Sequence, residues 1–372
     1  MMHQCQHPLK TQTLGTSRSI SSFHFGSDHK TKIYIQGSLH ADELPGMVVT
    51  WYLKQKLKLI EQEGRLKANI VLIPLANPIG LNQFVHGTQM GRFEQDSGQD
   101  FNRNYPIFGP QLAKQLESVL SDDAQANTQH VRQALAEHLQ ALEPVTELQS
   151  LRVELLKLAH DADLMLDLHC DWQASAHLYT TPGAWPEIEP LARYFGTKAQ
   201  LLADISGGEP FDEACVEPWH YLQQHFKGRF PIELGLKPVT LELRGVADVS
   251  AEQGQKDADA IIAYLTHCGY ISAEKTPMPE LIYPATPLAG CEYINSDVSG
   301  VLLHHAQVGE VVAKGQLLAE VLNPITDELT PLYASVDGMY YARHWQRFVS
   351  AGMLVARIAS SEANRSGDLL VP

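Results

Sequence analysis

The sequence predicts an α/β protein in which helices cover both faces of a sheet, followed by a small all-β domain. Two observations support this fold class. Near the N-terminus, a strand, a helix and a second strand follow one another within about forty-five residues, which is a βαβ unit and indicates a sheet with covered faces. After about residue 280, short apolar runs alternate with evenly placed glycines, a pattern typical of a small all-β domain.

Three segments make up the βαβ unit. Residues 32–36 are a short β-branched and aromatic run that stops at a glycine, which predicts a strand. From Pro45 to about Gly64, apolar residues recur at three- and four-residue spacing, which predicts an amphipathic helix with proline in its first turn. Residues 69–75 are an apolar run of strand length that ends at an Asn-Pro pair.

The rest of the chain continues the α/β pattern. The segment from about 80 to 110 has little periodicity, and a loop of that length in a compact domain usually carries function. The elements predicted after it are helical sequence over 111–160, a buried strand over 163–169, a helix over 185–202, a strand over 239–243 and a helix over 251–266. The first thirty residues are polar and lack a clear period, so we expect a mobile arm or an edge element.

The composition excludes several classes of protein. Among 372 residues there are 28 Lys and Arg but 43 Asp and Glu, which gives a net charge of −15, and the cations are not clustered. Binding to nucleic acid or to an anionic membrane needs clustered positive charge, so we expect neither partner. No window approaches the roughly eighteen consecutive apolar residues of a transmembrane helix, so we expect no membrane span.

Cysteine usage indicates a reducing compartment. The five cysteines are odd in number and form no C-x-x-C pair, which argues against a disulfide framework and against a cysteine-based zinc site. The N-terminus lacks the basic segment and apolar stretch of a secretion signal. We therefore expect a cytoplasmic protein, and the sequence does not indicate an oligomeric state.

Polar residues with metal-binding chemistry follow two predicted strands. His40 and Glu43 come just after the first strand, at the edge where open α/β sheets bind their ligands. An imidazole and a carboxylate three residues apart can bend toward one cation, and zinc accepts such ligands. The strand over 163–169 delivers a third candidate, His169, with Asp167 on the same face to orient its ring. The alternative, a core histidine that caps a strand, is the weaker explanation once the three residues are considered together.

Glu242 lies in the otherwise apolar strand predicted over 239–243. A carboxylate in such a strand is either a costly buried charge or a group placed for chemistry. Glu242 is therefore the candidate general base for an attacking water. The alternative is a glutamate on an edge strand that faces solvent.

The long loop supplies cations. Arg103 with Asn102 forms a fork-shaped set of donors suited to a substrate carboxylate, and Arg92 is placed to polarise a scissile carbonyl. In the alternative, these arginines form surface pairs with the nearby acidic residues Glu94, Asp96 and Asp100. Exposed pairs of this kind contribute only about 0–1 kcal/mol each, which would not explain the cluster.

Taken in order, these motifs resemble those of zinc carboxypeptidase-like hydrolases, and most closely those of their succinylglutamate desuccinylase/aspartoacylase branch. The matching segments are His40-x-x-Glu43, Asp100-x-Asn102-Arg103, Asp167-Leu168-His169 and Glu242. The resemblance covers roughly residues 30–360. It implies a zinc carboxypeptidase-like mixed sheet flanked by helices, followed by a small barrel-sandwich-like β domain.

The resemblance also implies an activity, the hydrolysis of the amide bond of a small N-acyl amino acid or a related carboxylate-bearing amide. One zinc ion per chain would be the cofactor. The implied roles are zinc ligand for His40, Glu43 and His169, base and proton shuttle for Glu242, carboxylate clamp for Asn102 and Arg103, and carbonyl polarisation for Arg92. Arg92 lies further from the clamp than it does in the shorter aspartoacylases.

Four regions are expected on this basis. They are an N-terminal arm (1–30), a zinc-hydrolase catalytic domain (31–275), a small β domain (281–360) and a C-terminal tail (361–372). The helical stretch at about 111–160 is longer than a minimal member needs, so we interpret it as an insertion that reshapes the pocket entrance.

The glycine-punctuated β domain resembles biotinyl/lipoyl carrier domains. A carrier holds its modifiable lysine on a hairpin, but the corresponding turn here, residues 323–328, contains no lysine. We therefore expect the domain to buttress or partly cover the active site and not to act as a swinging arm.

Three other functions compete with the amidohydrolase hypothesis. They are a metallocarboxypeptidase that trims peptide C-termini, an esterase-like deacylase of a different small acid, and a non-catalytic small-molecule binding module on the same fold. The complete ligand set argues against the binding module, because a degenerate site would be expected to lose at least one key residue.

Overall fold

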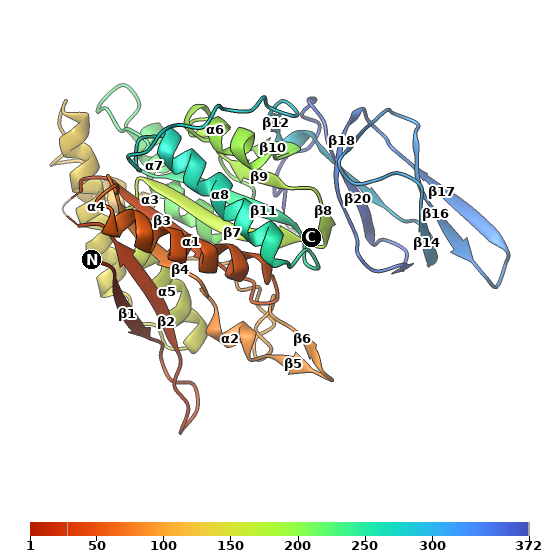
Figure 1. The fold of residues 1–372 in the computed structure, drawn as a ribbon, viewed down its shortest axis with the longest axis horizontal. Helices are drawn as coiled ribbons and strands as arrows, with labels where there is room; N and C mark the ends of the chain where they lie inside the picture. The colour runs from red at the N-terminus through yellow and green to blue at the C-terminus, as the bar shows by residue number, and fades with distance from the viewer. Residues whose placement is uncertain (28, 371–372) are drawn as a thin grey trace.

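The structure, a computed structural model, describes residues 1–27 and 29–370. Its centre is a nine-stranded sheet with strand order β1-β2-β4-β3-β7-β11-β9-β10-β12 (Figure 1). The strands are β1 (His3–Pro8), β2 (Ser19–Phe25), β3 (Lys32–Gly37), β4 (Asn69–Ile73), β7 (Leu164–Asp171), β9 (His177–Thr180), β10 (Ala199–Leu202), β11 (Lys237–Gly245) and β12 (Thr286–Pro287). The run β4-β3-β7-β11 is parallel, whereas β1, β2 and the β9–β11 pair are antiparallel, so the sheet is mixed.

The register of the central strands positions the site. Because β3, β7 and β11 are parallel neighbours, their carboxyl ends meet at one edge of the sheet. Gln36 of β3 is paired with Asp167 of β7, and Glu242 of β11 is paired with His169 of β7. Strand pairing therefore brings together residues that are far apart in the sequence.

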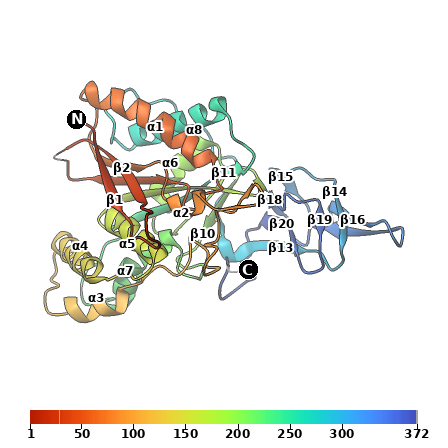
Figure 2. The ribbon, with the colours of Figure 1, turned by 90° about the horizontal axis from the view of Figure 1, so that it is seen from below.

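Helices cover both faces of the sheet (Figure 2). One face carries α1 (Pro45–Gln62), α6 (Trp185–Phe195) and α8 (Ala251–His267), and the other carries α3 (Gly109–Leu116), α4 (Ala124–Ala141), α5 (Glu147–Ala159) and α7 (Phe211–His225). Alternation along β3 divides the core, since Ile33 and Ile35 pack with the first group and Tyr34 packs with the second. The predicted α/β sheet with covered faces is confirmed.

The last strands form a separate pair of antiparallel sheets, which we call the C-terminal β unit (Figure 1). They are β13 (Cys291–Asn295), β14 (Gly300–His304), β15 (Glu310–Val312), β16 (Leu317–Asn323), β17 (Glu328–Tyr333), β18 (Gly338–Arg343), β19 (Phe348–Val349) and β20 (Leu354–Ala359). The orders are β13-β20-β18-β15 and β17-β16-β14-β19, and the two sheets enclose their own apolar core. The short strand β8 (Gln173–Ala174) pairs with β18 and joins this unit to the main sheet. The predicted small all-β fold is confirmed.

The long loop and the N-terminal segment contain more regular structure than a loop and an arm. The segment from about 80 to 110 includes the single-turn helix α2 (Pro78–Leu81) and a small hairpin of β5 (Phe84–Val85) and β6 (Thr88–Gln89). The first thirty residues contain the hairpin β1–β2, which extends the main sheet at its edge through β4. The helical sequence over 111–160 consists of α3, α4 and α5.

Two segments differ from the prediction. The helix predicted over 185–202 is wrong beyond Phe195, because Gly196 adopts a left-handed conformation (φ 71°) that ends α6, and Ala199–Leu202 is strand β10. Helix α7 is not predicted at all. It contains Pro218 in its interior, a residue type that normally breaks a helix, which obscures the helical pattern. None of the helices in the described ranges has the length and apolarity that a membrane crossing requires.

Candidate active site

The site begins in the turn between β3 and α1, where glycines allow close packing. A Cβ on Gly37, at the end of β3, would lie 3.0 Å from the carbonyl oxygen of Gly46 in the first turn of α1. A Cβ on Gly46 would lie 3.1 Å from the carbonyl oxygen of Leu168 in β7. Glycine at both positions lets α1 start directly against the ends of β3 and β7. The turn between them therefore holds His40 and Glu43 beside β7.

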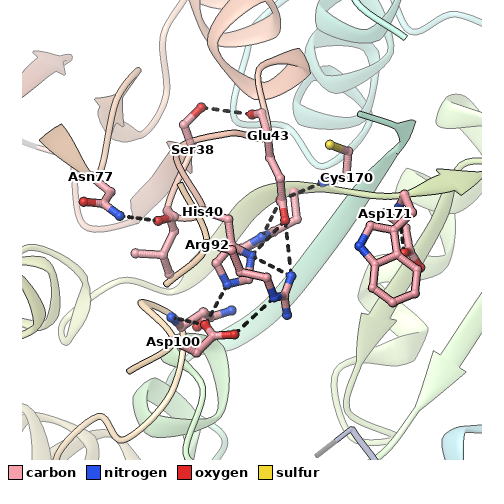
Figure 3. Close-up of polar contacts among 12 residues, drawn as sticks. Ser38, His40, Glu43, Asn77, Arg92, Asp100, Cys170 and Asp171 are labelled. Atoms are coloured by element: carbon pink, nitrogen blue, oxygen red, sulfur yellow. Dashed lines mark hydrogen bonds and ion pairs between the residues drawn. The ribbon is translucent and has the colours of Figure 1, made fainter. Parts of the chain in front are cut away.

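The three predicted metal ligands converge on one point. Figure 3 shows two of them, His40 and Glu43, beside Arg92 and Asp100. Nδ1 of His40 lies 2.8 Å from Oε1 of Glu43, and Nδ1 of His169 lies 2.9 Å from Oε2 of the same carboxylate. One ligand atom from each residue lies within 4.8 Å of the other two, and all three side chains are buried. The backbone N–H of Cys170 also donates to Oε2 of Glu43 at 2.9 Å. The Glu43 carboxylate is thus fixed between two imidazoles.

The other nitrogen of each imidazole faces a second carboxylate. Nε2 of His40 lies 2.8 Å from Oδ1 of Asp100, and Nε2 of His169 lies 3.1 Å from Oδ2 of Asp167. The side-chain amide of Gln36 donates to Asp167 at 2.9 Å and anchors it. The Asp100 contact is a hydrogen bond that orients the ring of His40, whereas Asp167 lies at ion-pair distance from His169; in both rings the Nδ1 atom is directed at the centre. Strand periodicity predicts the Asp167 contact, but the Asp100 contact joins residues 60 positions apart and no spacing rule predicts it.

The charges in this cluster shift the pKa values of its members. Burial alone would raise the pKa of Glu43, but His40 and His169 outweigh burial and hold that pKa well below its usual range. The pKa of Asp100 is lowered in the same way, against its burial, by the hydrogen bond and charge of His40. Burial disfavours the charged form of His169, yet Asp167 and Glu43 raise its pKa well above the usual value. The carboxylates of Glu43 and Asp100 are therefore held in the ionised form despite their burial.

The donor set fits a divalent metal ion. Two imidazole nitrogens and one carboxylate oxygen are typical ligands of catalytic zinc. Nη1 of Arg92 lies 3.3 Å from Nδ1 of His40 and 3.7 Å from Oε1 of Glu43, so a positive group already lies against two of the converging atoms. The side-chain chemistry of this triad (His40, Glu43 and His169) is thus able to hold a metal ion.

Glu242 adjoins the triad from β11. Its backbone is paired with that of His169, and its Oε2 atom is buried without a hydrogen-bond partner among the described residues. Burial, together with the charge of Glu43, raises the pKa of Glu242 to about 8. A buried carboxyl group that lacks a partner and titrates near neutral pH is suited to proton transfer.

The loop cations lie beside the triad but have different partners. Nε of Arg92 lies 3.2 Å from Oδ2 of Asp100, so Arg92 does pair with a carboxylate, and that carboxylate belongs to the site and not to the open surface. Within the described ranges Arg103 forms no ion pair; it donates to the backbone oxygens of Asn102 (2.7 Å) and Leu370 (3.2 Å). The side-chain oxygen of Asn102 accepts from the backbone N–H of the first residue of α7 at 2.8 Å.

All seven predicted site residues line a single cavity of about 980 Å³. The C-terminal β unit contributes Tyr293, His344 and Arg357 to its wall, and Arg357 pairs with Asp171 at the end of β7 at 2.5 Å. The β unit therefore partly covers the site, as its missing lysine led us to expect.

The helical segment 111–160 lies at one remove from the cavity. None of residues 111–160 lines the cavity, so any effect that they have on its entrance is indirect, and their role at the entrance stays a prediction. These helices instead cover one face of the sheet. Arg152 of α5 reaches the site loop, where it donates to the backbone oxygen of Asp100 at 3.1 Å and to the side chain of Gln99 at 3.0 Å. The segment 111–160 therefore supports the loop that carries the partner of His40.

The cavity wall also contains Asp212 and Glu213, which no sequence motif marks. They lie in the first turn of α7, the helix that the sequence pattern does not reveal. Acidic residues in a first turn are a signal of a helix start, so the pair could have located both the helix and this part of the wall.

Comparison with known proteins agrees with this geometry. Residues 29–268 match the family described as succinylglutamate desuccinylase/aspartoacylase catalytic domain. Over 335 residues the chain is 22% identical to the N-alpha-acetyl-L-2,4-diaminobutyric acid deacetylase of Halomonas elongata, an alignment that covers 87% of this chain and 81% of that protein.

Two solved structures resemble the whole chain. A succinylglutamate desuccinylase/aspartoacylase family protein of Shewanella amazonensis has a TM-score of 0.82 and 26% identity, covering 97% of this chain and 98% of that one. A protein described in the same terms from Shewanella frigidimarina has a TM-score of 0.83 and 24% identity, covering 98% and 99%. The triad, Glu242 and the loop cations all lie within the matched residues, and the chain belongs to the succinylglutamate desuccinylase/aspartoacylase family.

Proposed function

We propose that this protein is a zinc-dependent amidohydrolase that removes the acyl group from a small N-acyl amino acid or a related carboxylate-bearing amide. The observation that carries the proposal is the convergence of His40, Glu43 and His169 beside Glu242, whose buried carboxyl oxygen has no partner in the described part of the chain. Family membership supports it, because both activities in the family's name are deacylations. The Halomonas relative is likewise named as a deacetylase.

The triad would hold one zinc ion per chain, and Asp100 and Asp167 would keep the two imidazoles in place. When bound, zinc supplies a Lewis acid next to the scissile carbonyl and a source of nucleophilic water near neutral pH. Burial of the triad excludes bulk water and strengthens the electrostatic interactions inside the site.

Glu242 would accept the proton of the attacking water and return it to the leaving nitrogen. Its carboxyl group is suited to both steps because Oε2 is not engaged by another side chain in the described residues. A cation held by the neighbouring triad favours the ionised form of Glu242, which is the form that accepts a proton.

The two arginines would bind opposite parts of the substrate. Arg92 lies against the triad and would stabilise the oxyanion that forms at the scissile carbonyl. Arg103, with Asn102, would bind a substrate carboxylate. Because the present partners of Arg103 are neutral backbone oxygens, its positive charge is available for such a ligand.

The size of the cavity favours a small substrate over a peptide. Its volume of about 980 Å³ is in the range of small-molecule pockets, and the C-terminal β unit partly covers it. A metallocarboxypeptidase, by contrast, needs an opening through which the rest of its peptide substrate can extend out of the cavity. An esterase-like deacylase would use the same residues, so an assay must separate it from an amidase.

The experiment is a substrate panel on the zinc-loaded protein and on the same protein after removal of metal with a chelator. The panel contains N-acetyl and N-succinyl amino acids, the matching O-acyl esters and short peptides with a free C-terminus. We expect release of the acyl group from the N-acyl amino acids that depends on zinc and recovers when zinc is restored. Cleavage of peptides alone, or of esters alone, or no turnover with zinc bound, would contradict the proposal.

A further inference from the structure

We infer that the C-terminal tail, residues 361–370, is a positioning element of the active site. Through the backbone oxygen of Leu370, the tail holds the guanidinium group of Arg103 where a substrate carboxylate can reach it. This role rests on the proposed function, in which Arg103 is the carboxylate clamp. It gives a part in substrate binding to a segment that none of the sequence motifs marks.

A hydrogen bond joins the tail to the clamp. Nη2 of Arg103 donates to the backbone oxygen of Leu370 at 3.2 Å, and Nη1 donates to the backbone oxygen of Asn102 at 2.7 Å. Arg103 and Leu370 both line the cavity. A guanidinium group has five N–H donors, so these two bonds leave others for a substrate carboxylate. Without Leu370, the side chain of Arg103 would keep only the carbonyl group of the preceding residue as a hydrogen-bond partner in the described residues.

The tail is itself anchored by hydrogen bonds. The backbone N–H groups of Leu369 and Leu370 both donate to the carbonyl oxygen of Ser206, at 2.7 and 3.2 Å. The carbonyl oxygen of Leu369 accepts from the hydroxyl group of Tyr293 at 3.2 Å and from Nη2 of Arg365 at 2.9 Å. These bonds fix the peptide groups next to the carbonyl group of Leu370, so that carbonyl group is an acceptor with a defined position.

An apolar contact adds to this anchor. The side chain of Leu369 is 6% exposed and packs in a cluster to which β10 of the main sheet and β13, β18 and β20 of the C-terminal β unit all contribute. Leu369 therefore lies where the main sheet and the β unit meet. Removal of a leucine side chain from water is favourable, and it helps to keep this short segment docked.

A glycine makes room for the tail on the neighbouring loop. Gly207 has φ 98°, in the region that favours glycine, and it follows Ser206, the residue that accepts both N–H groups of the tail. A Cβ at position 207 would lie 2.7 Å from Cγ and 2.8 Å from Cβ of Asp368. Real Cβ atoms do not approach other atoms so closely, so a side chain at position 207 would displace the tail or the loop.

These contacts let the tail act on substrate binding through one side chain. A docked tail holds Arg103 in one orientation before the substrate arrives, and such preorganisation lowers the cost of binding a carboxylate. None of the tail contacts described above involves the triad or Glu242. Loss of the tail should therefore weaken the binding of a substrate carboxylate and leave the catalytic step nearly unchanged.

Two variants undock the tail in different ways. One ends the chain after Gly367, and the other, Gly207→Ala, places a methyl group against Asp368. Gly315→Ala is the matched control, because Gly315 has φ 85° but a Cβ there would meet no atom within 4 Å. We measure kcat and KM on zinc-loaded protein for the N-acyl amino acid that the wild type cleaves best and for its carboxamide, which lacks the carboxylate. Zinc content and melting temperature are measured on the same samples.

We expect both variants to raise KM for the N-acyl amino acid by about three- to tenfold, with little change in kcat, in zinc content or in KM for the carboxamide. In the Arg103→Ala background, neither change should raise KM further, because the tail acts through that side chain. Gly315→Ala should behave like the wild type. Gly207→Ala decides the question if the shortened chain does not fold.

The possible failures are distinguishable. An unchanged KM, an equal increase for the carboxamide, or an increase that persists in the Arg103→Ala background would overturn the role of the tail and leave the deacylase function standing. No turnover of any N-acyl amino acid by the zinc-loaded wild type would overturn the proposed function, and the role of the tail with it.

Discussion

The carboxylates that line or support the cavity fall into two groups with opposite behaviour. Glu43, Asp100 and Asp167 each contact an imidazole at 2.8–3.1 Å. Glu242 and Glu213, by contrast, have no such partner in the described residues, and burial raises their pKa values to about 8 and about 7. Against their burial, the imidazoles lower the pKa values of Glu43 and Asp100, which keeps these two carboxylates of the proposed metal site ionised. Carboxylates without a basic partner can change their protonation state within the folded protein.

The largest effect should come from the unpaired carboxylate next to the triad. Glu242→Gln is nearly isosteric but cannot accept a proton, so turnover should fall by about 10²–10⁴-fold, the usual contribution of a general base. Zinc content should not change, because Glu242 is not a proposed ligand. Steady-state kinetics with metal analysis on the same sample measures both, and Glu189→Gln on the surface of α6 is the control. Turnover near the wild-type rate would show that another group is the general base.

The pH dependence of stability should separate the two groups next. As the pH rises, an unfolded chain releases the Glu213 proton near 4.5, whereas the folded protein keeps it until about 7. The folded state binds more protons in this window, so the free energy of unfolding should fall with rising pH, by up to about 3 kcal/mol. Glu213→Gln should remove this contribution.

Urea unfolding of the metal-free protein between pH 4.5 and 7.5 measures this difference, because metal removal keeps the triad from adding its own pH dependence. The quantity to compare is the free energy of unfolding of the wild type minus that of Glu213→Gln at each pH. A difference that does not vary with pH would show that Glu213 titrates as an ordinary exposed glutamate.

Substitution of a carboxylate that contacts an imidazole should change the affinity for the metal ion. It should not change how the free energy of unfolding depends on pH between 4.5 and 7.5. Asp100→Asn keeps the shape of the side chain but weakens the orientation of His40, so zinc affinity should fall by about 10–100-fold. Competition with a chromophoric chelator measures the affinity. Asp96→Asn, in the same loop but outside the site, should leave it unchanged. Unaltered affinity in Asp100→Asn would mean that the contact to His40 is incidental.

The smallest effect should come from Arg103, a cation that, like the unpaired carboxylates, has no partner of opposite charge in the described residues. Arg103 has only backbone oxygens as partners in the described structure, and a substrate carboxylate would be its charged ligand. Arg103→Ala should raise KM for carboxylate-bearing substrates by about tenfold, with a smaller change in kcat. The matching amide substrate, which lacks the carboxylate, should show no such increase. Equal effects on the two substrates would count against the clamp.

The sequence predicted those elements and site residues that are marked by periodicity or by end residues within a single helix or strand. The strand at 32–36, the helix from Pro45 and the strand that ends in His169 are all marked by periodicity and by their end residues. The same strand pattern placed Asp167 on the face of His169. These predictions held because each depends on contacts within one element or on the common edge of parallel strands.

The features that could not be predicted from the sequence depend on how distant segments pack against one another. The contact of Asp100 with His40 spans the long loop, and the role of residues 111–160 depends on which face of the sheet they cover. Helix α7 was missed because Pro218 interrupts its pattern, and with it the acidic residues Asp212 and Glu213 of the cavity wall.

The most direct test of the central claim is the zinc content of the wild type and of His169→Ala at equimolar zinc. The edge hairpin offers a matched control in His24, since His3, Cys5 and His24 form the other group of potential ligand atoms in the described residues. We predict about one zinc ion per chain in the wild type and in His24→Ala, and little in His169→Ala. Full zinc content in His169→Ala, or its loss in His24→Ala alone, would show that the buried triad is not the metal site.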